Sequence, residues 1–164
     1  MVFWMARAPG GSQNKQDSLA LQVLMEIMSG NATTRLYKSL VVEQKLATSA
    51  SMGYSEQSRD LRTISASLVP ASGVAPEKLE AAFYAELERV GRDGVSDSEL
   101  SEAKTRMKDS AAYARDSLSG PARIVGQALA TGLTLDDVEY WPYDIDAVTA
   151  AQVKDVALRH LVQN

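Results

Sequence analysis

Apolar and polar residues alternate in three short segments of the first half of the chain. Alternation with a period of two is typical of β-strands that have one buried side. It predicts strands from Val2 to Ala8, from Leu46 to Tyr54 and from Leu61 to Val69. The polar segment from Ser55 to Arg59 fits a hairpin loop, and Pro70 ends the third strand because proline cannot donate to a sheet ladder.

Most of the remaining apolar residues recur every three or four positions, which is typical of amphipathic helices. Such a helix is predicted from Asp17 to Ser29, and a short second one carries Leu36, Tyr37, Leu40 and Val41. The second half of the chain contains four or five more. Their predicted starts carry helix-capping or proline signals, namely Pro76, Ser96 with Glu99, Gly120 with Pro121, Thr134 to Asp137, and Thr149 with Gln152.

Strands and helices are therefore segregated along the chain. This order predicts an α+β domain in which helices pack on one face of an antiparallel sheet. In the helix that starts at Gly120, we expect Ile124, Val125, Ala128 and Leu129 to face inward.

Size and charge limit the classes of function. With 164 residues, a mass of 17.7 kDa and 45% hydrophobic residues, residues 1–164 are expected to form a single domain with its own core. A net charge of −4 and a pI near 5.0 argue against a nucleic-acid partner, which needs a basic face. No apolar run approaches the ~20 residues of a membrane span. The absence of cysteine excludes disulfides and thiol catalysis.

The chain has one histidine, His160, and this limits its metal and acid–base chemistry. Hydrolytic zinc sites need several histidine or carboxylate ligands at fixed spacing. A single histidine cannot form an H-x-x-E-H motif. His160 also lies on the apolar stripe of the last predicted helix, so we interpret it as a structural, packed side chain.

Acidic residues cluster in two places, and neither cluster predicts a catalytic pair. Asp136 and Asp137 fall in the first turn of a predicted helix, where carboxylates complement the helix dipole. Asp97, Glu99 and Glu102 are interpreted as a solvated face. We therefore predict no catalytic residue and no metal ligand on this chain.

Residues 30–54, with the sequence G-N-A-T-T-R-L-Y-K-S-L-V-V-E-Q-K-L-A-T-S-A-S-M-G-Y, carry a resemblance to a known family. The segment is similar to one in the second domain of each half of pitrilysin, insulin-degrading enzyme and the mitochondrial processing peptidases. Further stretches fit the same domain in order: A-R-A-P-G, D-S-L-A-L-Q-V-L, D-G-V-S-D-S-E-L-S-E-A-K, Y-A-R-D-S-L-S-G-P-A, and G-L-T-L-D-D-V-E-Y-W followed by V-T-A-A-Q-V.

The resemblance thus covers nearly the whole chain. Family domains close with another strand soon after the last helix, and this chain stops at Asn164 before any such strand. The resemblance therefore implies a fragment of a longer, two-domain peptidase subunit whose final strand is missing.

What the resemblance implies about chemistry depends on Val41 and Thr48. Members of the family are zinc metallopeptidases whose two halves enclose a chamber. The first domain of the active half carries H-x-x-E-H, and the second domain of the other half supplies an Arg and a Tyr that hold substrate and the developing oxyanion. Val41 and Thr48 occupy the positions of that pair. Valine has no donor and the threonine hydroxyl is short, so neither is expected to act.

Two nearby residues are not expected to replace the missing pair. Arg35 precedes Val41 by six helical positions and falls on a different side of the helix. Tyr54 is expected to share a face with Thr48, but it lies six residues further, roughly 20 Å at ~3.3 Å per residue.

Two hypotheses remain. In the first, the chain is the second domain of a catalytic subunit. Its partners are then a preceding zinc domain that holds the metal, a second homologous subunit that supplies the Arg–Tyr pair, and extended peptide substrates. In the second, it is a non-catalytic assembly or peptide-holding subunit. The resemblance favours a periplasmic location, because many bacterial relatives are exported, and leaves a cytoplasmic one open.

The second hypothesis is motivated by the strand from Leu46 to Tyr54. We expect a small-residue side formed by Ala47, Ser49, Ser51 and Gly53. An extended peptide could approach this side and add as another strand. The same small residues could equally accommodate a closely packed helix.

Overall fold

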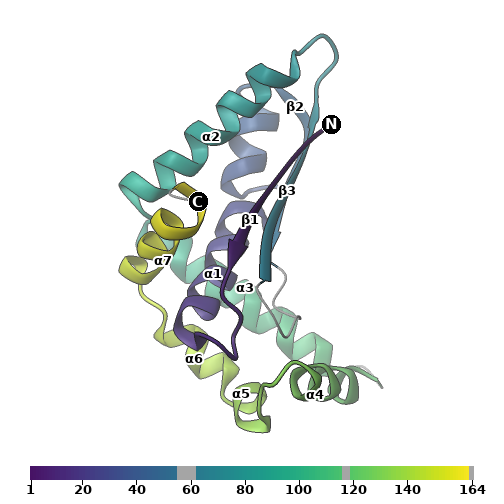
Figure 1. Cartoon of the computed structure of the whole chain (residues 1–164), viewed down its shortest axis with the longest axis vertical. Helices are drawn as coiled ribbons and strands as arrows, with labels where there is room; N and C mark the ends of the chain where they lie inside the picture. Colours follow the sequence, from purple (N-terminus) through teal and green to yellow (C-terminus); the bar gives the residue numbers. More distant parts are fainter. Residues whose placement is uncertain (55–61, 116–118, 163–164) are drawn as a thin grey trace.

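The computed structural model describes residues 1–54, 62–115 and 119–162, which form a three-stranded antiparallel sheet with helices on one of its faces (Figure 1). The strands are β1 (Val2–Ala8), β2 (Ala47–Tyr54) and β3 (Arg62–Pro70), in the order β1–β3–β2. The predicted α+β fold is confirmed. The predicted hairpin loop from Ser55 to Arg59 lies outside the described residues.

Seven α-helices and two short π-helical segments, η1 and η2, make up the rest of the described chain. They are α1 (Lys15–Ser29), η1 (Tyr37–Glu43), α2 (Pro76–Asp93), α3 (Asp97–Arg115), α4 (Gly120–Ala130), α5 (Leu135–Glu139), α6 (Trp141–Ala147), α7 (Ala150–Ala157) and η2 (Leu158–Val162). The predicted helix starts at Pro76, Gly120 and Thr149 are each within one residue of the observed ones.

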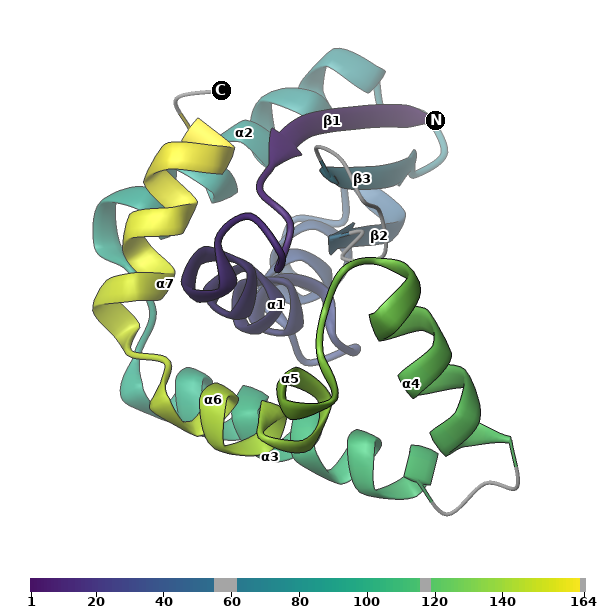
Figure 2. The ribbon, with the colours of Figure 1, turned by 60° about the horizontal axis from the view of Figure 1, so that its bottom comes forward.

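Helix α1 runs through the middle of the molecule, with β2 on one side and α3, α6 and α7 on others (Figure 2). It is therefore buried on more than the single stripe that the sequence pattern suggested. Val23, Leu24 and Met25 are consecutive in sequence and all buried. A helix that is apolar on most of its circumference is typical of a core position.

The central strand β3 shows the predicted alternation, with Ile64, Ala66 and Leu68 buried against the helices. The opposite face of the sheet is left open by the described elements. It exposes Phe3 and Met5 on β1, and small residues on β2.

A β-bulge at the start of β2 changes the faces that the sequence pattern predicted. The register with β3 shifts between Ala47 and Ser49, and such a shift inserts one extra residue and rotates those that precede it. Ala47 is therefore buried, and the prediction that it belongs to the exposed small-residue side is wrong. Thr48 is exposed while Tyr54 faces the core, so the prediction that they share a face is also wrong.

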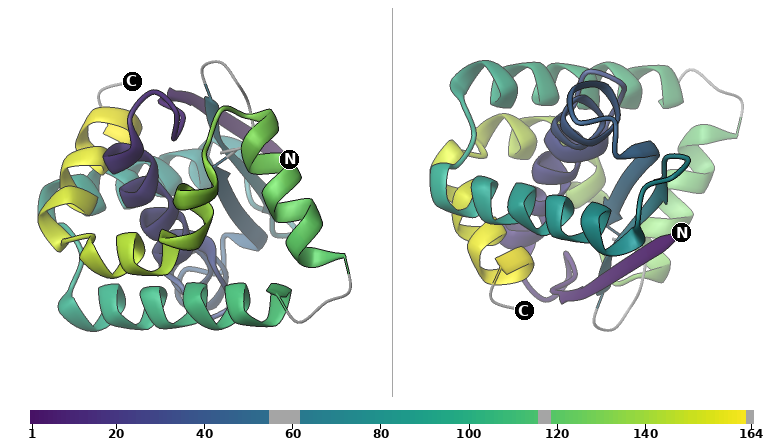
Figure 3. Two further views of the ribbon diagram at one scale, coloured as in Figure 1. Left: turned by 90° about the horizontal axis from the view of Figure 1, so that it is seen from below. Right: turned by 90° about the horizontal axis from the view of Figure 1, so that it is seen from above.

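Helix α4 lies at the margin of the molecule, where its main contacts are with α3 and α5 (Figure 3). Ala128 is buried there, as predicted, but Leu129 is 50% exposed. The prediction that Leu129 faces inward is wrong because only one narrow side of this marginal helix meets other elements.

Candidate functional site

The junction between η1 and β2 holds the two positions singled out in the sequence, Val41 and Thr48. The chain leaves η1, turns at Lys45 with a left-handed backbone (φ 54°), and enters β2. The amide of Leu46 donates to the carbonyl oxygen of Leu40 at 2.9 Å, which holds the turn against the preceding helix. The spacing between the two positions is therefore set by a well-bonded segment.

Neither side chain at these positions offers a long polar group. Val41 is partly buried and packs against the core. Thr48 is exposed, and its hydroxyl lies 3.4 Å from the carbonyl oxygen of Val69 on the neighbouring strand. That Val41 and Thr48 occupy the substrate-facing positions remains a prediction.

The guanidinium of Arg35 forms a structural ion pair with Glu99. Its Nε and Nη2 donate to the two carboxylate oxygens of Glu99 at 2.6 and 2.8 Å, and Nη2 also donates to the carbonyl of Gly94 at 3.0 Å. This pair ties the segment before η1 to the start of α3. The guanidinium of Arg35, followed by hydrogen bonds from Ser96, lowers the pKa of Glu99 to about 2.

Asp97 and Glu102 are exposed as expected, whereas Glu99 is only 33% exposed and is held by Arg35, which the sequence analysis did not predict. Glu99 also accepts from the amide of Ser96 at 2.9 Å, and its own amide donates to the Ser96 hydroxyl at 3.2 Å. These reciprocal bonds are the capping box that the sequence predicted.

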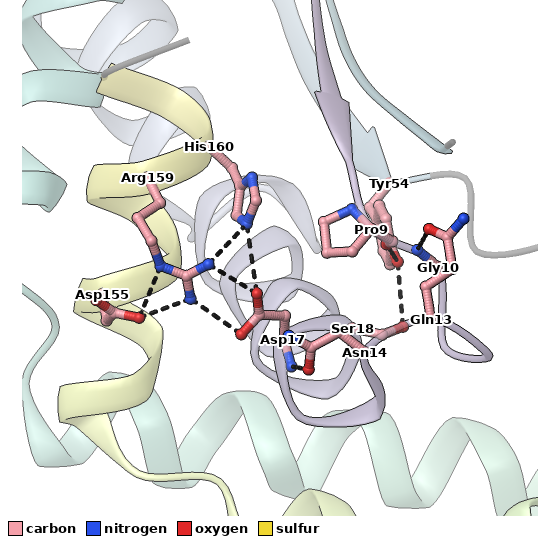
Figure 4. A network of polar contacts seen from close by, with 10 residues as sticks. All are labelled: Pro9, Gly10, Gln13, Asn14, Asp17, Ser18, Tyr54, Asp155, Arg159 and His160. Carbon is pink, nitrogen blue, oxygen red and sulfur yellow. Dashed lines mark hydrogen bonds and ion pairs between the residues drawn. The ribbon is translucent and has the colours of Figure 1, made fainter. Parts of the chain in front are cut away.

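The hydroxyl of Tyr54 is also occupied within the fold (Figure 4). It donates to the carbonyl oxygen of Pro9 and lies 3.1 Å from the hydroxyl of Ser18 on α1. Tyr54 therefore fastens β2 to the connection between β1 and α1, and cannot stabilise an oxyanion on the open face.

His160 lies beside the part-buried ion pair of Arg159 with Asp17. The guanidinium of Arg159 donates to both oxygens of Asp17 at 2.7 and 2.9 Å and to Asp155 at 2.6 Å, and His160 Nε2 lies 3.6 Å from Asp17 (Figure 4). The Arg159 contact, assisted by His160, lowers the pKa of Asp17. This network fastens α7 and η2 to the first turn of α1.

Within residues 1–54, 62–115 and 119–162, no three His, Cys, Asp or Glu side chains are grouped so that they could hold a metal ion. The acidic pair Asp136–Asp137 lies in the first turn of α5, as predicted. Asp137 accepts from the amide of Thr134 at 2.9 Å and from Lys15 at 2.8 Å. Lys15 and these cap bonds lower the pKa of Asp137 to about 2, so the carboxylate serves the helix start.

The sequence analysis did not identify two features that could bind a ligand. One is the buried Arg62 at the start of β3, which is 1% exposed. Arg62 lies two residues before Ile64, on the core-facing side of the strand. This position in the alternating pattern could have indicated that Arg62 is buried. The other is a shallow groove beside β2 of about 470 Å³, whose lining includes Met25, Met52 and Met107.

Comparison with known proteins decides the family. The sequence profile of the peptidase M16 inactive domain matches residues 2–107. The chain belongs to this family. The resemblance to the second, non-zinc domain of these peptidases is therefore confirmed. No curated protein sequence matches the chain.

Solved structures share the fold of this M16 inactive domain. A protease from Helicobacter pylori has a TM-score of 0.88 at 18% identity over 96% of the chain, which spans 37% of that protein. The inactive peptidase domain of a candidate zinc protease from Bordetella parapertussis has a TM-score of 0.85 at 19% identity, with 98% of this chain and 85% of that one covered.

A third neighbour of the M16 domain is the periplasmic protease PqqL from Escherichia coli. Its TM-score is 0.69 at 17% identity, over 97% of this chain and 17% of that protein. Identities this low show the common fold alone. None of the helices in the described residues of the M16 domain is long and apolar enough to cross a membrane.

Proposed function

We propose that this chain is the inactive domain of a zinc endopeptidase subunit, where it lines the substrate chamber and supports the domain that binds zinc. The observation that carries the proposal is the match to the M16 inactive domain, in a chain with valine and threonine at positions 41 and 48. In this proposal residues 1–164 are one domain of a longer, two-domain subunit. A second homologous subunit supplies the Arg–Tyr pair, which makes the enzyme a heterodimer.

No group of side chains in the described part of the chain fits a zinc ion, which supports placing the metal in the preceding domain. The one imidazole, His160, lies against Asp17 and Arg159. Zinc in the other domain would activate water. This domain would then contribute the chamber wall and the closure that excludes solvent. The periplasmic neighbour from Escherichia coli supports a periplasmic location.

Reading the coding sequence upstream of this domain separates the proposal from the scaffold alternative. A preceding domain with H-x-x-E-H is expected. Its absence would assign the chain to a subunit that has lost both the zinc motif and the donor pair.

Thr48→Ala in the full-length subunit, assembled with its partner, should leave kcat within about twofold of the wild type. The removal of a working oxyanion donor costs about 10²–10³ in kcat, and the exposed Thr48 hydroxyl makes only a long contact, at 3.4 Å, with a backbone carbonyl. Peptide turnover would be measured for Thr48→Ala and, as a control on an exposed residue of the same strand, Ser49→Ala. A hundredfold loss confined to Thr48→Ala would contradict the assignment of a passive wall.

A second candidate function is the holding of an extended peptide along β2. This strand lies at the end of the sheet order, and its outer edge borders the groove lined by Met25, Met52 and Met107. The amide of Met52 donates to the hydroxyl of Ser29 at 2.8 Å and not to β3. The Met52 donor is thus already used by α1, and a peptide strand would pair with the part of the edge that precedes it. Methionine side chains adapt to varied partners, so the groove could pack against the side chains of such a peptide.

Ala50→Pro tests peptide holding without disturbing the sheet. Because the Met52 amide points away from β3, the amide of Ala50 two residues earlier points to the same outer edge. Proline there removes an edge donor but no ladder bond. We expect binding of unfolded peptides to be lost in Ala50→Pro and kept in Ser49→Ala. Absence of wild-type binding at millimolar peptide would refute this function.

A further inference from the structure

Arg62 is a buried cation in the wall of a partly open, mainly apolar cavity. It pairs with Ala8 at the end of β1, and it precedes Ile64 on the core-facing side of β3. Its side chain crosses the backbone of Gly10 so closely that a Cβ at Gly10 would collide with its Nε. Glycine at position 10 is therefore what allows the guanidinium to reach inward.

The guanidinium has no partner in the part of the chain that the structure describes. Nε, Nη1 and Nη2 are all buried and make no hydrogen bond. The two carboxylates in the same cavity wall, Asp137 and Asp144, each lie 2.8 Å from Lys15 Nζ, and neither forms an ion pair with Arg62. A buried charge without a partner carries a large desolvation penalty. An anion that enters the cavity would relieve it.

The cavity beside Arg62 has room for such an anion. Its volume is about 250 Å³, well above the ~30 Å³ of one water molecule. Leu19, Ile124, Leu133 and Val138 contribute apolar walls from α1, α4, the α4–α5 connection and α5. The indole of Trp141 also lines it, and its Nε1 already donates to Gln22 at 2.9 Å. The site thus combines the planar N–H donors of the Arg62 guanidinium with mainly apolar walls.

We propose that this cavity binds a carboxylate joined to a small apolar group, with Arg62 as the anion receptor. The planar guanidinium matches a carboxylate through two parallel hydrogen bonds. A doubly charged phosphate fits less well, because Asp137 and Asp144 share the single charge of Lys15 and leave a negative wall. Two sources present this chemistry: the carboxyl terminus of a peptide that ends in an aliphatic residue, and a free short-chain acid.

Calorimetry on the 164-residue chain distinguishes the sources. The probes are N-acetyl-leucine and hexanoate, with N-acetyl-leucinamide and hexanamide as uncharged controls. We expect an acid to bind saturably and its amide at least about tenfold more weakly, because each amide lacks the charge that Arg62 receives. Binding of N-acetyl-leucine alone assigns a peptide terminus, and binding of hexanoate as well assigns a general acid site. Binding of neither acid, or equal binding of acids and amides, overturns the proposal.

Two variants identify the receptor. Arg62→Met should abolish the preference for the acid and raise the melting temperature of the ligand-free chain, since an uncompensated buried charge is replaced by an apolar side chain of similar length. Arg92 is the control, because its guanidinium is exposed and paired with Asp93. Arg92→Met should bind the acid as the wild type does.

If Arg62→Met does not fold, Ile124→Trp fills the cavity from α4 and keeps Arg62. A folded Ile124→Trp that still binds the acid overturns the proposal, as does acid preference retained in Arg62→Met.

Discussion

Phe83→Ala should lower the free energy of unfolding by about 3–5 kcal/mol. Phe83 is fully buried on α2, and its ring meets that of Trp4 on β1 edge-to-face with centroids 5.8 Å apart. Removal of the ring leaves a cavity between a helix and the sheet, and also removes an aromatic pair worth about 0.5–1.5 kcal/mol beyond its buried area. Urea unfolding followed by circular dichroism measures the loss as a lower midpoint with an unchanged slope.

Tyr84→Ala is the matched control for this prediction. Tyr84 is the next residue, its ring lies 6.0 Å from that of Phe83, and it is 42% exposed. We expect a loss of under about 1 kcal/mol for Tyr84→Ala, because Tyr84 is 42% exposed and its removal takes much less apolar surface out of the core than the removal of Phe83. Equal losses for the two variants would show that α2 does not pack on the sheet through Phe83.

Asp17→Ala should cost about 1–3 kcal/mol, because it leaves Arg159 without its most buried acceptor. The Asp17 side chain is 12% exposed and Arg159 is 40% exposed, so solvent relieves part of the penalty. Asp155→Ala is the matched control, since Asp155 contacts the same guanidinium at 2.6 Å but is 61% exposed. Exposed pairs of this kind contribute about 0.2–1 kcal/mol. A larger loss in Asp155→Ala than in Asp17→Ala would contradict the burial of this network.

The same pair predicts a direction for the pH dependence of stability. The Arg159 contact lowers the pKa of Asp17 in the fold, so the unfolded chain binds this proton more readily. The contribution of Asp17 is therefore complete above the unfolded carboxyl pKa of ~3.9, and is lost as the pH falls through the folded value. Unfolding free energies measured from pH 7 to pH 3 should show a difference between wild type and Asp17→Ala that shrinks at the acidic end. A constant difference would exclude the ion pair as its source.

Local rules predicted much of the fold. The capping boxes at Ser96–Glu99 and Thr149–Gln152 form as expected, because each involves side chains and amides only three residues apart. The proline at position 76 and the alternation from Ile64 to Leu68 also indicated their elements correctly. The six stretches pointed to the family because residue identity and order along the chain, which need no tertiary structure, carry that resemblance.

The candidate site depended more on contacts between distant segments. The pattern placed Ala47 on the exposed side of its strand, but the bulge depends on how β2 registers with β3. Leu129 has a helical spacing typical of a buried residue, but whether a neighbour covers it depends on where α4 lies. Arg35 and Glu99 are 64 positions apart in sequence. Their ion pair makes a carboxylate that was predicted to lie on a solvated face part of the link between the segment before η1 and the start of α3.

Composition and spacing alone established that this chain has one imidazole, no thiol and no donor of useful length at Val41 or Thr48, because those facts belong to residue identity. Three-dimensional packing established that Arg62 is buried beside a mainly apolar cavity and has no partner among the described residues. The physical reason is the sequence separation over which each interaction acts. A helix cap is satisfied within one turn of the chain, whereas burial and charge pairing are set by whichever segments the fold brings together.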